Sequence, residues 1–210
     1  MADILIDNQS APTTPASGKS VIYVDSTTKR MTNIADDGRA NSTFLSGNDS
    51  TAQQVLPASN TYVTNSGILI PSFGMKAGML FRWYMFISKT AAGTGAPIFT
   101  LKIGAAQSTA DTTRATITGV AQTAAVDTAV FQFLCHVRTV SATGQVVFNV
   151  ALAGKQAANA VGFGSSSVVN IPSTFDNTGL AGQYVGIAID PVATGTPVWT
   201  IDMVEAKLSG

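Results

Sequence analysis

Phe131-Gln132-Phe133-Leu134-Cys135-His136-Val137-Arg138 carries an apolar side chain at every odd position and a mainly polar one at the even positions. Successive side chains of a β-strand point to opposite faces of its sheet, so this period of two predicts a strand with one face in a hydrophobic core. The same alternation recurs in residues 99–103, 146–152, 185–189 and 198–203. The chain is therefore expected to be built from β-strands.

Clusters of turn-forming residues separate these predicted strands. They are Ala91–Gly95, Ala142–Gly144, Asp176–Gly179 and Asp190–Gly195. Gly, Asn, Asp and Pro favour tight turns, and no segment shows the period of 3.6 that an amphipathic helix requires. Short strands that alternate with turns are typical of sandwiches and barrels. The pattern predicts an all-β, antiparallel sandwich.

Residues 79–87 differ from the other strands, because both of their faces are apolar apart from Arg82. A strand of this kind is central in its sheet, or it presents one face to a neighbouring subunit. The candidate subunit-interface residues are Arg82, Trp83, Tyr84 and Phe86. Exposed Trp83 and Tyr84 would form a platform on which a sugar could stack, but their apolar neighbours favour the core or a subunit interface.

The first part of the chain, residues 1–59, is polar and rich in turns, and Pro12 and Pro15 stiffen a spacer within it. Residues 20–25 and 29–34 predict a short hairpin, followed by a turn at 36–38. Because an isolated hairpin is only marginally stable, it is expected to gain order on another chain. The sequence thus predicts an attachment arm over 1–59 and a folded domain over 60–210. The candidate attachment residues are Pro12, Pro15, Tyr23, Asp36, Asp37 and Gly38.

The composition is unusual because few of the residues are charged. Of the 210 residues, 45% are hydrophobic and only 11% are charged, and the formal net charge is zero; about 25% charged residues is usual. A neutral chain has no long-range field to attract nucleic acid or an anionic membrane, and so few charges oppose self-association weakly. Residues 1–7 do not form a signal sequence, and no apolar run spans a membrane. A soluble protein made in the cytoplasm is expected.

Few residues are available for catalysis. His136 is the single histidine and Cys135 the single cysteine. Because neighbouring strand residues point to opposite faces, Cys135 is expected in the core and His136 on the outer face, too far apart to act as a nucleophile and its base. A single cysteine cannot form an intramolecular disulfide, and it could supply only one thiol ligand to a metal site.

Carboxylate chemistry is equally sparse. Glu205 is the single glutamate, and the aspartates lie mostly in turns, where capping is a more common role than glycoside hydrolysis. Asp36-Asp37-Gly38 with Asn33 lacks the spacing of a calcium-binding loop. Residues 162–167 are rich in glycine, but no lysine or helix follows as in a phosphate-binding loop. We expect neither enzymatic activity nor a metal or cofactor.

Two parts of the chain resemble structural proteins of tailed phages. Thr14-Pro15-Ala16-Ser17-Gly18-Lys19-Ser20-Val21-Ile22-Tyr23-Val24-Asp25, continuing to the turn at 36–38, resembles the opening of phage fibre and appendage proteins. The body resembles their jelly-roll domains through residues 88–94, 121–124, 175–178 and 199–201. The resemblance implies a jelly roll, attachment to a virion through the N-terminal arm, and assembly as a homotrimer.

These observations together predict a non-enzymatic protein on the virion surface, made in the host cytoplasm. It would be a capsid cement or decoration protein or a head fibre, with partners among its own copies, the major capsid protein and tail or neck proteins. The alternative is a tail or neck fibre that recognises a host surface glycan or protein. Its contacts would be loops on a rigid scaffold, around Gly93, Gly144, Gly164 and Gly195.

Overall fold

The structure is a computed structural model that describes residues 8–9, 20–25, 31–35, 40–42, 47–91, 94–155, 163–164, 167–192 and 199–209. Every regular element within these ranges is a strand, as the alternation predicts. The described residues contain no helix of the length and apolar character needed to cross a membrane. The chain divides into two compact units, Met1–Ser46 and Gly47–Gly210.

The N-terminal unit contains a four-stranded sheet in the order β1-β2-β3-β4. Its strands are β1 (Asn8–Gln9), β2 (Ser20–Asp25), β3 (Met31–Ala35) and β4 (Ala40–Ser42). β2 and β3 are antiparallel, with Ser20 opposite Ala35, and correspond to the predicted hairpin. β1 adds parallel to β2 and β4 adds antiparallel to β3, so the hairpin forms the centre of a sheet and does not stand alone.

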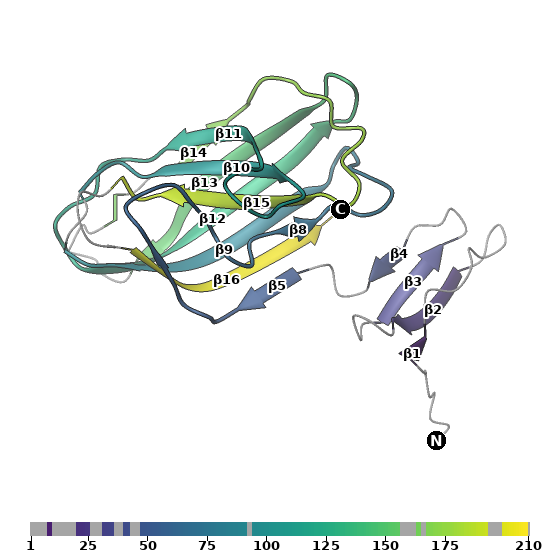
Figure 1. Ribbon diagram of the computed structural model, residues 1–210, viewed down its shortest axis with the longest axis horizontal. Helices are drawn as coiled ribbons and strands as arrows, with labels where there is room; N and C mark the ends of the chain where they lie inside the picture. The colour runs from purple at the N-terminus through teal and green to yellow at the C-terminus, as the bar shows by residue number, and fades with distance from the viewer. Residues whose placement is uncertain are drawn as a thin grey trace. The chain divides into compact units, whose positions relative to one another are not determined.

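The second unit is a sandwich of two sheets, whose strands overlap in the view of Figure 1. The seven-stranded sheet contains β5 (Gly47–Ser50), β6 (Gln54–Leu56), β9 (Leu80–Lys89), β12 (Asp127–Thr139), β13 (Gln145–Lys155), β14 (Ser167–Asn170) and β16 (Trp199–Ser209). The five-stranded sheet contains β7 (Thr61–Tyr62), β8 (Ile68–Leu69), β10 (Ile98–Gly104), β11 (Thr112–Thr118) and β15 (Tyr184–Asp190).

The strand order is that of a jelly roll. β6, β16, β9 and β12 are neighbours in one sheet, and β7, β15, β10 and β11 are neighbours in the other. The last two strands of the chain therefore insert between early strands, β15 between β7 and β10 and β16 between β6 and β9, as in two interlocked Greek keys. The predicted jelly-roll sandwich is confirmed, with β13 and β14 as an extension of the larger sheet.

The sandwich begins earlier in the chain than the predicted boundary between residues 59 and 60. β5 and β6 pair with β16, so residues 47–56 belong to the sandwich, and the division falls after Ser46. Gly47–Ser50 is too polar to show the alternation of a core strand. β5 lies at the end of its sheet, where its backbone pairs with one neighbour, β16.

The core lies between the two sheets and is held together by aromatic rings. Phe99 of β10 has its ring centroid 5.6 Å from that of Phe131, 5.4 Å from that of Phe133 and 6.5 Å from that of Trp199. These three rings come from β12 and β16 of the opposite sheet, and all four residues are at most 1% exposed. Phe99 therefore joins the sheets through edge and tilted ring contacts, which aromatic pairs prefer.

We expect Phe99→Ala to lower the free energy of unfolding by about 3 to 5 kcal/mol, because it opens a cavity where the two sheets meet. Chemical denaturation of the full chain would measure the loss. Val126→Ala is the matched control, because Val126 is 69% exposed and its truncation removes no core contact. Equal, small changes in both variants would contradict this role for Phe99.

Candidate functional site

Of the predicted attachment residues, only Tyr23 lies within the described residues. Its backbone belongs to β2 and is paired with Thr32 of β3. The other attachment residues, Pro12, Pro15, Asp36, Asp37 and Gly38, lie outside the described residues.

The predicted subunit-interface residues all lie on β9, which is central in its sheet, between β12 and β16. Arg82, Tyr84 and Phe86 are on the face directed away from the core. Trp83 points the other way: it is fully buried, and its Nε1 donates a hydrogen bond to the Ser66 carbonyl oxygen at 2.6 Å. The assignment of Trp83 to a subunit surface is therefore corrected, because adjacent strand residues point to opposite faces. The same burial excludes a sugar-stacking pair of Trp83 and Tyr84.

We use the name outer face for the side of the seven-stranded sheet that carries Arg82, Tyr84 and Phe86. Phe86 lies opposite Val130 of β12 and Met203 of β16, and it is 40% exposed. Tyr84 lies opposite Gln132, whose Nε2 donates to the tyrosine hydroxyl at 2.6 Å. The centre of the outer face is thus an aromatic and aliphatic surface that includes a fixed tyrosine.

Arg82 places a positive charge without a counter-ion on the outer face. Its cross-strand neighbour on β16 is Lys207, which itself forms an ion pair with Glu205. The Nε of Arg82 is shielded from solvent and donates to no acceptor among the described residues, and its guanidinium carbon lies 5.9 Å from the Tyr84 ring centroid. The arginine therefore lies near an aromatic ring and has no carboxylate partner among the described residues of the sandwich.

The expected separation of Cys135 and His136 is confirmed. Cys135 is fully buried in the core, and burial raises the pKa of its thiol to about 12 because the thiolate would lose its hydration. His136 is exposed on the opposite side of β12. A buried neutral thiol is inert as a nucleophile.

The described aspartates have structural roles. Asp176 accepts hydrogen bonds from the Thr178 hydroxyl at 2.7 Å and from the Thr178 amide at 3.0 Å, and these two bonds lower the pKa of the Asp176 carboxyl. Asp190 accepts a hydrogen bond from the amide of Val192 at 2.8 Å. Both are turn caps, as predicted. Asp127 is buried and accepts from the amide of Phe163 at 3.0 Å. Within the described ranges, no three His, Cys, Asp or Glu residues gather to hold a metal ion.

The two predicted contact loops that the structure describes lie at opposite ends of the sandwich. Gly144 precedes β13 at the end of the sandwich where β5 begins and β16 finishes, which we call the junction end. Gly164 lies at the opposite, far end, where its amide donates to Oε1 of Gln122 at 2.8 Å. Gly93 and Gly195 lie outside the described residues.

A buried lysine organises the far end. Lys89 is 2% exposed, and its Nζ donates to the carbonyl oxygens of Thr90, Thr123 and Ala125 at 3.1, 2.8 and 2.7 Å. Burial lowers the pKa of this ammonium group, and the nearby charge of Asp127 opposes the shift. One side chain thus ties the end of β9 to the loop before β12.

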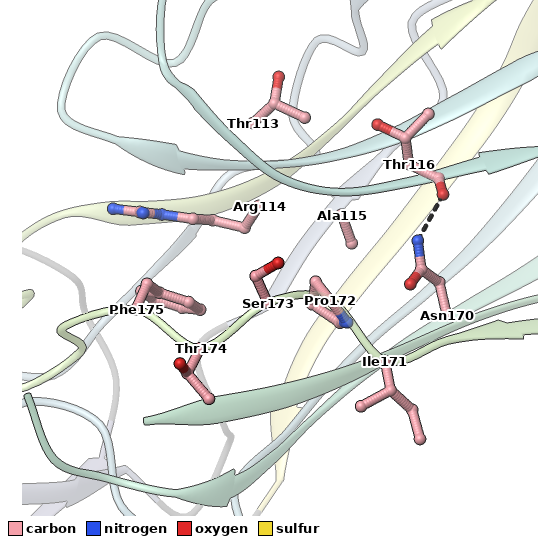
Figure 2. A pocket seen from close by; sticks show the side chains of 10 residues that line it. All are labelled: Thr113, Arg114, Ala115, Thr116, Asn170, Ile171, Pro172, Ser173, Thr174 and Phe175. Atoms are coloured by element: carbon pink, nitrogen blue, oxygen red, sulfur yellow. Dashed lines mark hydrogen bonds between the residues drawn. The ribbon is translucent and has the colours of Figure 1, made fainter. Parts of the chain in front are cut away.

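A groove that no sequence pattern predicts lies between β11 and residues 170–175 (Figure 2). The groove has a volume of about 520 Å³ and is lined by Thr113, Arg114, Ala115, Thr116, Asn170, Ile171, Pro172, Ser173, Thr174 and Phe175. The guanidinium carbon of Arg114 lies 4.3 Å from the Phe175 ring centroid. Asn170 bridges the two walls, because its Nδ2 donates to the Thr116 carbonyl oxygen at 2.6 Å. No local pattern connects these distant segments, so sequence reasoning missed the site.

No protein-family model, curated protein or solved structure matches the chain. The fold and the described surfaces define a jelly-roll protein with two candidate contact surfaces, the outer face and the groove.

We expect Cys135 to resist thiol reagents in the folded chain and to react fully once the chain is unfolded, because the buried thiol carries almost no thiolate at pH 8. Colorimetric thiol titration with and without denaturant measures this, and the single cysteine makes the expected end point one thiol per chain. Rapid labelling of the native protein would contradict the burial.

Proposed function

We propose that the chain is a non-enzymatic structural protein on the surface of a phage-like particle, either a capsid decoration protein or a head fibre. In this proposal residues 1–46 attach it to a capsid, neck or tail protein, and the sandwich assembles as a homotrimer. The observation that carries the proposal is the polarity of the sandwich, which has a junction end joined to the N-terminal unit and a far end without such a connection.

The register of the strands defines this polarity. Gly47, the first residue of the sandwich, is paired with Lys207 near the end of β16, and Ser209 is paired with Leu80. The first and the last described residues of the sandwich therefore both lie at the junction end. At the far end, Lys89 and Gln122 form hydrogen bonds with the loops that connect the strands. A domain tethered at one end suits a surface appendage.

The N-terminal sheet supports an attachment role through its size. Its strands contain only two to six residues each. Sheets this small bury little apolar surface and gain stability by packing against a partner. Attachment to a structural protein of the particle would supply that packing.

The outer face supports self-association through its composition. Tyr, Phe, Met and Arg are enriched in protein interfaces, and Tyr84, Phe86, Met203 and Arg82 lie together here. The low charged fraction of the whole chain offers little repulsion between copies. The trimeric state itself follows from the resemblance to phage proteins, and the outer face is where we place the subunit contact.

Deletion of residues 1–46 is expected to abolish incorporation into particles while the sandwich stays folded, because β5 and β6 remain in their sheet. Immunoblotting of purified particles, together with thermal unfolding of the truncated chain, would test this. Truncated protein retained on particles would refute the role of the N-terminal unit.

Phe86→Asp is expected to convert trimers into single chains, because a buried carboxylate without a partner opposes association. Light scattering after size exclusion would measure the mass, expected at three times that of one chain for the unmodified protein. Val126→Asp adds the same charge at an exposed far-end position and is expected to remain trimeric. An unchanged Phe86→Asp trimer would exclude the outer face as the contact.

The second candidate function is receptor binding by a tail or neck fibre, and the groove beside Arg114 is the observation that favours it. A fibre is present in few copies per particle and a decoration protein in many, so quantitative mass spectrometry of particles distinguishes them. Inhibition of adsorption by the purified chain would favour receptor binding.

A further inference from the structure

We propose that the groove between β11 and residues 170–175 binds a carboxylate-bearing saccharide, with Arg114 as the anion-binding residue. This inference concerns the sandwich alone and holds whether or not the chain belongs to a particle.

Arg114 is available for an anion. Its Nε is shielded from solvent and unpaired, and its guanidinium forms neither a hydrogen bond nor an ion pair with any described residue. None of the residues that line the groove is acidic. The carboxylate of Asp176, the next residue after Phe175, is engaged by Thr178. A partly desolvated guanidinium without a counter-ion favours a ligand carboxylate, which it binds through two parallel hydrogen bonds.

The position of Arg114 is built into the sheet. Leu101 of β10 is paired with Ala115 and Lys102 with Thr113, so Arg114 is the additional residue of a β-bulge. Bulges redirect a side chain and are common beside functional sites. The Phe175 ring holds the guanidinium from the other wall, and Phe175 is fixed in turn because its amide donates to the Gly144 carbonyl oxygen at 3.0 Å.

The rest of the lining suits a polyhydroxylated ligand. Thr116, Ser173 and Thr174 are exposed residues whose hydroxyl groups can both donate and accept hydrogen bonds. The Thr113 hydroxyl is also exposed, but its oxygen already accepts a hydrogen bond from the Lys102 Nζ at 2.8 Å, so it is left as a donor. Figure 2 shows Thr113 and Thr116 on the β11 wall, and Ser173 and Thr174 on the other wall together with Pro172 and Phe175. Sugar rings combine hydroxyl edges with apolar C–H faces, and this lining offers partners for both.

A peptide fits the groove less well. An extended peptide binds an edge strand by pairing with its free backbone groups. At β11 the Thr116 carbonyl oxygen already accepts a hydrogen bond from Asn170, and residues 171–175 form the opposite wall. A continuous added strand is therefore blocked, while a ligand that uses side-chain hydroxyls and Arg114 is not.

The test is isothermal titration calorimetry of the full chain with oligogalacturonate, with its methyl ester, and with an oligoglutamate of similar charge. We expect binding of oligogalacturonate alone. Arg114→Gln is expected to weaken it about tenfold or more, the effect of one charged hydrogen-bonding partner. Lys76→Gln removes the same charge from an exposed residue outside the groove and is expected to bind as the unmodified chain does.

Arg114→Lys keeps the charge and the aliphatic stem but loses the planar fork, and we expect intermediate affinity and an unchanged unfolding midpoint. This variant keeps the test decisive if Arg114→Gln does not fold. Three results would overturn the proposal: no binding of oligogalacturonate, equal binding of the ester or of oligoglutamate, or full affinity in both Arg114 variants.

Discussion

The contact between Phe99 and the rings of Phe131, Phe133 and Trp199 is the interaction on which the sandwich depends. Phe163 extends the cluster, with its ring centroid 5.0 Å from that of Trp199. In a jelly roll the chain crosses between the sheets at nearly every step, so the sheets hold their mutual position only if the layer between them is filled. Loss of these rings would release both sheets at once.

The same alternation that fills the core also creates the surfaces. Each strand of the larger sheet sends one set of side chains inward and the next set outward, which separates Trp83 from Tyr84 and Cys135 from His136. Function is therefore restricted to the side chains that packing does not use. The outer face consists of the outward side chains of the larger sheet. The groove lies on the side of the sandwich where β11 and β14 are the last strands of their sheets among the described residues.

Sequence reasoning found the features that have a local pattern. The alternation over 131–138 and 99–103 predicts β12 and β10, and it places Cys135 and His136 correctly. It missed β5, because a strand held at a sheet's end by backbone pairing needs no apolar face. It also missed the groove, because the bulge at Arg114 depends on pairing with β10 and the opposite wall comes from residues far along the chain. Such features arise from tertiary structure alone.

The hydrogen bond from Asn170 to the Thr116 carbonyl oxygen has a consequence for colloidal behaviour. Unpaired strand edges are templates on which sheets of different molecules join, and charged residues at the edge are a common protection. This chain has a net charge of zero and few charged residues, so electrostatic repulsion offers little defence. An amide that occupies an acceptor of the open strand provides protection independent of charge and ionic strength. With this acceptor occupied, β11 is a poorer template for a strand of a second copy.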